Sequence, residues 1–464
     1  MADTPAQPDD RREGTAADGP DGTAADGPDA TAAGGPDATA AKGSDGPAAG
    51  GPHDTAPGAP PAGAGPRRGV LFPLYAAGFV TAFGAHAVAT GAGAETGSGQ
   101  LSVLALGLVL AVYDGAEILL KPVFGSLADR VGPRRVLVGG LIAFAAVSLV
   151  YALVAVAGGM ASGPGSAVAL TLARLGQGAA ASAFSPAAGA MVGRLGSGGR
   201  QGRVFGSYGA WKGLGYTAGP VIGGVVLTFA GFTTLFVLLA AVAVAVTVWA
   251  VLSVPALPPL PRQRQTVVDL ARRLSAPGFL RPTAALAGTT AALATAVGFL
   301  PALGTAAGLS AIVTGAVVAC LALSSTLVQP RAGRAHDHGR LTTRTALAVG
   351  FALMVVGFVL AATVPGIVAL VVAAVVIGLG VGIATPVAFA SLAASSPPER
   401  LGQTMGSAEV GRELGDAGGP LLVGVVATAA SVAVGLGALA AVLAVVGAAA
   451  VAGRFATPPA DGRG

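Results

Sequence analysis

Hydrophobic runs of about 20 residues recur along the chain from Val70 to about Arg454, separated by short connections. A run of that length crosses the ~30 Å hydrocarbon core of a bilayer when it is helical. We therefore predict an all-α membrane protein with twelve spanning helices, at residues 70–91, 101–122, 136–157, 166–193, 204–229, 233–254, 283–304, 310–330, 342–363, 367–394, 404–428 and 433–454.

The longest connection between two runs, residues 255–282, divides the helices into two sets of six. It opens with the proline-rich "VPALPPLPRQRQ" and continues with "TVVDLARRL", in which Val267, Leu270 and Leu274 share a helix face opposite Arg272 and Arg273. This pattern predicts a linker with a short interfacial helix. The expected bundles are residues 69–254 and 283–454, followed by a C-terminal tail at 455–464.

Residues 1–68 are dominated by Ala, Gly, Pro, Asp and Thr, and contain four tandem octads, GTAADGPD, GTAADGPD, ATAAGGPD and ATAAKGSD. Such a segment has almost no apolar surface with which to offset the entropy of ordering. It predicts a disordered tail, for which a partner-binding role is the alternative.

The two sets of helices are similar in sequence to one another. At an offset of 200, "GRVFGSYGAWKGLGYTAGP" from Gly202 aligns without a gap with "GQTMGSAEVGRELGDAGGP" from Gly402, so that Lys212 meets Arg412. At an offset of 208, Pro122, Gly125 and Asp129 align with Pro330, Gly333 and Asp337. This is the pattern of a parallel repeat, in which two bundles rock about a central site.

The composition agrees with a membrane protein and restricts its partners. Charged residues make up 11% of the chain, against about 25% in soluble domains, and the mean hydropathy is +0.73. The net charge of +5 does not indicate nucleic-acid binding, because the Lys and Arg outside the spans all fall in the N-terminal segment, the even-numbered connections and the C-terminus. The positive-inside rule then places both termini in the cytoplasm. Cys320 is the only cysteine, which excludes an intrachain disulfide.

Charged residues inside the predicted spans are the candidates for function, because a charge at mid-bilayer costs at least ~2.5–3.5 kcal/mol. Five acids and three bases were identified as candidates, namely Asp114, Glu117, Arg174, Lys212, Glu409, Arg412, Glu413 and Asp416. An excess of buried acid suits the exchange of protons for a neutral or cationic substrate.

Four of these candidates share one face of a helix. Glu409, Arg412, Glu413 and Asp416 follow the i, i+3, i+4, i+7 spacing, so we expect them to face the interior between the bundles. Arg412 can pair with Glu409 or with Asp416. The alternative is that these charges form structural pairs that only fix the helix register.

A second acidic pair lies in "AVYDGAEILLKP", where Asp114 and Glu117 are i, i+3 neighbours. Two carboxylates this close cannot both ionise cheaply at low dielectric, so one is expected to carry a proton near neutral pH. Arg174 would favour the ionised form of whichever acid it meets. A proton-coupling site needs this property.

Several motifs resemble those of the major facilitator superfamily. The segment "GSLADRVGPRR" is similar to the family's G-x-L-a-D-R-x-G-r-r motif through Gly125, Asp129, Arg130 and Gly132, with Pro133 at a position that is usually basic. Whether Arg134 or Arg135 makes the docking contact is left open. A shorter copy, "GRAHDHGR", supplies Gly333 and Asp337 in the second half. The resemblance implies a gate at the cytoplasmic ends, with Asp129 accepting hydrogen bonds from a helix N-terminus or pairing with basic neighbours.

Two further segments carry the same resemblance. "RLGQGAAASAFSP" looks like the family's R-x-x-q-G motif, with Arg174 in place. The spacing G-x8-G-x3-G-P-x2-G-G is similar to the motif associated with the family's antiporters, at Gly206, Gly215, Gly219, Pro220, Gly223 and Gly224. Glycines at these positions also permit close helix packing, which is the structural alternative.

The resemblance implies a carrier that works by alternating access, and its antiporter motif implies proton-coupled efflux of drug-like or metabolite-like compounds. A proton symporter that imports a nutrient and a non-transporting sensor are the alternatives. We expect no enzymatic activity, no cofactor and no metal site; His336, Asp337 and His338 lie in a loop. The expected partners are a small-molecule substrate, protons and the lipid bilayer, with the chain a monomer in the cell membrane. Phe79, Phe83, Phe184, Phe299 and Phe389 are candidates for the pocket lining.

Overall fold

The computed structural model of the chain is almost entirely helical, and it describes residues 68–97, 103–157, 164–261 and 266–452. Residues 1–67 of the predicted N-terminal tail and the predicted C-terminal tail lie outside the described residues. In chain order the helices are α1 (Arg68–Gly97), α2 (Val103–Val131), α3 (Pro133–Val156), α4 (Pro164–Leu195), α5 (Gln201–Ser253), α6 (Val267–Leu274), α7 (Pro277–Ala306), α8 (Ala311–Asp337), α9 (Thr343–Thr363), α10 (Ile367–Ala394), the short 3₁₀ helix η1 (Pro398–Arg400), α11 (Leu401–Ala429) and α12 (Val432–Val451).

The long helices account for the predicted membrane crossings. Eight of the described helices are long and apolar enough to cross a bilayer. One of them, α5, has 53 residues and changes direction at Gly231, whose φ of 73° lies in the left-handed region that glycine adopts at little cost. The break predicted between the spans 204–229 and 233–254 is therefore a single residue, and α5 supplies both of these crossings. With α2, α4 and α11 added, the described helices supply twelve crossings.

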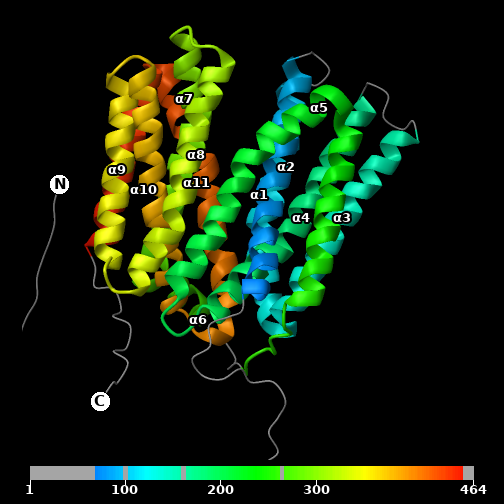
Figure 1. Cartoon of the computed structure of the whole chain (residues 1–464). Helices are drawn as coiled ribbons and strands as arrows, with labels where there is room; N and C mark the ends of the chain where they lie inside the picture. The colour runs from blue at the N-terminus through cyan, green and yellow to red at the C-terminus, as the bar shows by residue number, and fades with distance from the viewer. Residues whose placement is uncertain (1–67, 98–102, 158–163, 262–265, 453–464) are drawn as a thin grey trace, which may run out of the picture. The chain divides into compact units, whose positions relative to one another are not determined.

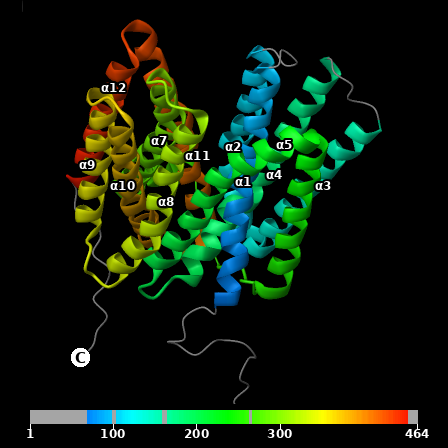
Figure 2. The same ribbon diagram turned by 45° about the horizontal axis from the view of Figure 1, so that its top comes forward.

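The helices form two bundles, α1 to α5 and α7 to α12 (Figure 1). In both ribbon views α3 lies at the outer side of the first bundle and α9 at the outer side of the second (Figures 1 and 2). The predicted fold class is confirmed.

The outer faces of the bundles are apolar and exposed. Phe229 and Leu252 on α5 are 84% and 79% exposed, and Leu119 on α2 is 73% exposed. Exposed apolar area of this kind is unfavourable in water and favourable against lipid. On α2 the same helix buries Glu117 and Lys121 on its other face, so its two sides are adapted to lipid and to the protein interior.

The bundles meet through two equivalent helix pairs, α2 with α11 and α5 with α8. At the first crossing a Cβ on Gly125 would meet the carbonyl oxygen of Gly402, and at the second a Cβ on Gly333 would meet that of Gly202. Backbones approach this closely only where neither residue has a side chain. The sequence repeat thus has a direct structural counterpart in both interfaces.

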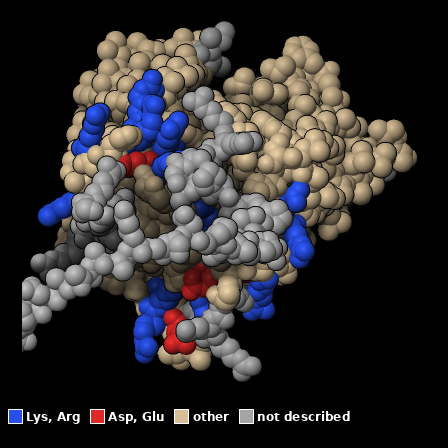
Figure 3. Space-filling view, turned by 60° about the horizontal axis from the view of Figure 1, so that its bottom comes forward, with Lys and Arg blue, Asp and Glu red and all other residues tan. Residues whose placement is uncertain are grey.

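One end of the bundles is rich in Lys and Arg (Figure 3), and we call it the basic end. It holds the 2–3, 4–5, 8–9 and 10–11 connections and α6. Helix α6 is capped by Thr266, whose hydrogen bonds lower the pKa of Asp269. Arg273 of α6 donates to Thr404 Oγ1 of α11 at 2.9 Å, which fastens the linker to the second bundle.

Candidate functional site

Six buried or nearly buried charged side chains join α2, α5 and α11 in one ionic network, which we call the charge cluster. Its members are Glu117 and Lys121 of α2, Lys212 of α5, and Glu409, Arg412 and Glu413 of α11. They provide three cations and three anions. The cluster therefore links helices of both bundles with balanced formal charge, which offsets much of the burial cost.

Lys121 is the centre of the α2 side of the cluster. Its Nζ donates to Glu117 Oε2 at 2.8 Å and to Glu413 Oε1 at 2.5 Å, and lies 3.5 Å from Glu409 Oε2. Its side chain is fully buried. Sequence reasoning missed this residue because it stands at the end of a predicted span, beside residues assigned to the basic side.

The signal that could have found Lys121 is its i, i+4 spacing from Glu117, the spacing of a helical ion pair. Adding it leaves five acids against four bases among the intramembrane candidates. The acid excess is thus one rather than two, and the expectation of a neutral or cationic substrate loses most of its support. The prediction that Asp114 and Glu117 cannot both be ionised also changes. Glu117 is paired with Lys121, and this cation favours its ionised form.

Glu409 is the centre of the α11 side. Its Oε1 accepts from Arg412 Nη1 at 2.8 Å, and its Oε2 accepts from Lys212 Nζ at 2.9 Å. Of the two partners left open for Arg412, the structure gives Glu409. A single carboxylate is thus shared by cations from α5 and α11.

The remaining intramembrane candidates stand beside the cluster. Asp114 and Asp416 are half-buried and form no ion pair within the described ranges. The guanidinium of Arg174 lies 3.9 Å from the ring centroid of Tyr113. Arg174 Nε and Nη1 have no hydrogen-bond partner among the described residues. The structure therefore places Arg174 beside Tyr113, next to Asp114 in sequence, without an ion pair to either Asp114 or Glu117 among the described residues.

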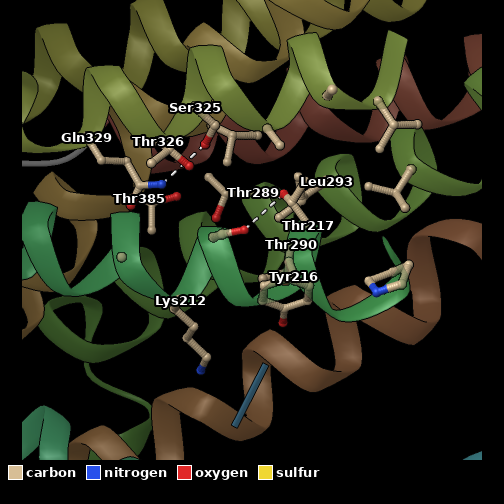
Figure 4. A pocket seen from close by; sticks show the side chains of 18 of the residues that line it. Lys212, Tyr216, Thr217, Thr289, Thr290, Leu293, Ser325, Thr326, Gln329 and Thr385 are labelled. Atoms are coloured by element: carbon tan, nitrogen blue, oxygen red, sulfur yellow. Dashed lines mark hydrogen bonds between the residues drawn. The ribbon is translucent and has the colours of Figure 1, made fainter. Parts of the chain in front are cut away.

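A cavity of about 300 Å³ lies between the two bundles. Its walls come from α5, α7, α8 and α10, with Arg412 contributed by α11. In Figure 4, Ser325, Thr326 and Gln329 of α8 lie on one side of α5, and Gln329 Nε2 donates to Ser325 Oγ at 3.2 Å. Aliphatic and hydroxyl side chains make up most of the lining, which suits a small amphipathic molecule.

The repeat explains why the cavity lies beside α5 and α8. At the two sequence offsets, Glu117 and Lys121 of α2 correspond to Ser325 and Gln329 of α8. Glu409 and Glu413 of α11 correspond to Gly209 and Gly213 of α5, which both line the cavity. Acidic and basic side chains fill the interface between α2 and α11, whereas the equivalent interface between α5 and α8 has glycines. The cavity occupies the space that side chains at Gly209 and Gly213 would fill.

Of the five phenylalanines proposed as pocket lining, only Phe389 borders the cavity. Phe79 and Phe83 stack on each other with ring centroids 5.3 Å apart, and Phe184 packs against Phe144. These contacts belong to the core of the first bundle. The phenylalanine spacing alone could not separate core from cavity.

At the basic end, two aspartates cap helices of the opposite bundle. Asp129 accepts from the backbone N–H groups of Gly402 and Gln403 at the start of α11, each at 2.8 Å. Asp337 accepts from Gly202 and Arg203 at the start of α5, each at 2.7 Å. A carboxylate at a helix N-terminus is favourable because it meets both unpaired N–H groups and the helix dipole.

The other residues of the first gating motif lie around this contact. Arg134 Nη2 donates to the carbonyl oxygen of Val251 in α5 at 2.6 Å, whereas Arg135 reaches only Val131 O on the preceding helix at 3.4 Å. Arg130 is exposed. Gly132 has a φ of 96°, which permits the tight turn between α2 and α3.

We expect Asp129→Asn and Asp337→Asn each to weaken closure of the basic end, because the amide loses the charge that favours a helix N-terminus. The loss is about 1 kcal/mol, which corresponds to about a fivefold shift in the conformational equilibrium. Cysteine labelling measures this shift. An impermeant maleimide is applied at the basic end, and its rate of reaction with Thr326→Cys is followed in a Cys320→Ala background. Asp269→Asn, an exposed cap at the same end, is the control and should leave the labelling rate unchanged. Equal rates in all variants would contradict the gating role.

The glycines of the helix 5 motif pack against neighbouring helices. A Cβ on Gly215 or Gly219 would meet the backbone of α1 near Phe83, and one on Gly223 would meet Ala87. Gly206 faces the backbone of Gln329 in α8. Gly224 is half-buried, and Pro220 lies within α5 and lines the cavity. The motif thus holds α5 against α1 and brings it close to α8.

The described part of the chain has no group of three or more His, Cys, Asp or Glu side chains arranged as metal ligands. The polar chemistry of the interior is that of ion pairs and hydroxyl groups. Such an arrangement can bind and release protons and hydrogen-bond a substrate.

Comparisons with known proteins agree with this architecture. The profile of the Major Facilitator Superfamily matches residues 67–364 and again 284–464. A puromycin resistance protein of Streptomyces alboniger is 35% identical over 157 residues, which cover 34% of this chain and 27% of that protein.

Two solved structures have the same fold. The human organic anion transporter is 17% identical with a TM-score of 0.67, covering 82% of this chain and 99% of its own. The fucose:proton symporter of E. coli is 14% identical with the same TM-score, covering 82% and 97%. At these identities the likeness concerns the fold alone.

Proposed function

Because the chain belongs to the Major Facilitator Superfamily, we propose that it is a secondary active transporter that exports small amphipathic molecules in exchange for protons. The observation that carries this proposal is the charge cluster, which joins α2 and α11 across the two bundles beside a central cavity. A buried ionic network between two moving parts must rearrange when they separate. Its carboxylates then lose cationic partners and gain affinity for protons.

The topology follows from the basic end. We assign it to the cytoplasm by the positive-inside rule. The caps made by Asp129 and Asp337 then close the cytoplasmic side in this state. Substrate would leave on the opposite side, and opening of the caps would return the cavity to the cytoplasm.

Two observations favour export as the direction. The glycine spacing of α5 resembles the antiporter motif, and the relative from Streptomyces alboniger is described as a puromycin resistance protein. Resistance to a toxic compound is a natural consequence of efflux. Proton exchange supplies the energy, for which Asp114 is the candidate carrier because it is half-buried and has no ion pair within the described ranges.

Flux measurements in proteoliposomes test the function. Purified carrier should move a small amphipathic compound against its gradient only when an opposing pH gradient is imposed. We expect Asp114→Asn to abolish the gradient-driven flux while preserving insertion and folding, because the amide keeps the shape but cannot cycle a proton. Wild-type pH dependence in this variant would exclude Asp114 from coupling.

Each competing function predicts a different result in the same assay. A symporter would move substrate and protons in the same direction. A sensor or scaffold would bind without any flux. Flux opposed to the proton gradient excludes both.

A further inference from the structure

The cavity between α5 and α8 is bordered by positive charge. Its only charged lining residues are Lys212 and Arg412, and no carboxylate of the described chain lines it. Lys212 extends from α5 on the side away from Ser325 and Thr326 (Figure 4). The residue borders the cavity, and its ammonium pairs with Glu409 of the charge cluster at 2.9 Å.

The two cations share a single anion. Within the described ranges Lys212 and Arg412 each form one ion pair, and both pairs are with Glu409, at 2.9 and 2.8 Å. The third cation, Lys121, has Glu117 and Glu413 as its close partners. Asp416 lies one turn beyond Arg412 on α11 without pairing to it. The two cations that border the cavity thus depend on one carboxylate as their ion-pair partner, although the charge cluster as a whole is balanced.

Arg412 also has unused hydrogen-bonding capacity. Its side chain is 7% exposed, and its Nε is buried with no hydrogen-bond partner in the described structure. A buried donor left without an acceptor is costly, and it is more so when the group is charged. A ligand that brings a negatively charged acceptor to Arg412 would give this donor a partner and would bind a cation that now shares its carboxylate with Lys212.

We propose that the transported substrate is an amphipathic organic monoanion. Its acidic group binds Arg412 and Lys212 in competition with Glu409, and its apolar body lies against the aliphatic residues of α7 and α8, among them Leu293 and Val318. The volume of about 300 Å³ limits the substrate to a small molecule. This inference rests on the proposed transport function and names its substrate class.

The proposed exchange would be electrogenic. When a proton enters as a monoanion leaves, one positive charge moves inward and one negative charge moves outward, so each cycle transfers a net two positive charges inward. Transport should therefore respond to membrane potential as well as to the pH gradient.

A matched set of ligands tests the charge requirement, namely phenylbutyrate, its amide and phenylbutylamine, titrated by calorimetry into the full-length carrier. We expect the acid to bind about 10- to 100-fold more tightly than the amide, the usual effect of hydrogen bonds to a charged group. Lys212→Gln should reduce the acid-over-amide ratio to about that of a neutral site. Arg344→Gln, which removes an exposed positive charge outside the cavity, should preserve the ratio. Amide or amine binding as tight as that of the acid overturns the proposal.

Glu409→Gln gives a second measurement that does not depend on transport. It vacates the carboxylate position, so phenylbutyrate should raise the melting temperature of this variant more than that of the wild type, and the amide should not. No acid-specific rise, together with no acid binding, overturns the proposal. Acid binding without flux would reject the transport function but retain the anion site. Flux of puromycin or the amine without any preference for acids would reject the anion site alone.

Discussion

Replacing Lys121 with glutamine is expected to destabilise the carrier by about 3–5 kcal/mol, the usual cost of removing one partner of a buried ion pair. Glu117 and Glu413 would lose Lys121 as their cationic partner, and both are buried or nearly so. Thermal unfolding in detergent should show a large fall in melting temperature, and proteoliposomes should show no flux. Arg344→Gln, an exposed basic residue of α9, should change stability by no more than about 0.5 kcal/mol.

The repeat supplies a compensated variant. Glu117→Ser with Lys121→Gln gives α2 the same pair that α8 has in Ser325 and Gln329, and adding Glu413→Gln removes the remaining unpaired acid. Neutral replacement of a whole buried network often restores stability. We expect the triple variant to recover its melting temperature without recovering proton-driven flux. Recovery of both would mean that the charges of α2 serve the structure only.

Glu409→Gln is expected to have the second large effect, because it removes the only anion that Lys212 and Arg412 share in the described structure. The free energy of unfolding should again fall by about 3–5 kcal/mol. Arg412→Gln should lower the stability less, because Glu409 keeps Lys212 as an ion-pair partner at 2.9 Å.

A double-mutant cycle measures the contact directly. Arg412→Gln combined with Glu409→Gln should be more stable than Glu409→Gln alone, because the double variant leaves one buried cation fewer unpaired. Unfolding free energies of the four proteins give the coupling energy. Additive losses would show that the pair at 2.8 Å contributes nothing to stability.

The membrane class, the number of crossings, the repeat and the face on which α11 carries its charges can all be predicted from the amino-acid sequence. Each of these depends on local spacing: the length of an apolar run, or the recurrence of Glu409, Arg412 and Glu413 at helical intervals. The repeat also identified Asp129 and Asp337 as equivalent, and the structure shows them in equivalent contacts.

Only the tertiary structure decided which charges meet. Lys121 was overlooked because its burial depends on α11, about 290 residues further along the chain, which covers it. The cavity was likewise not predictable from the phenylalanines, because it arises where Gly209 and Gly213 replace the acids of α11. Ion-pair partners and empty space are properties of facing surfaces, and helical spacing specifies a residue's own face but not the face opposite.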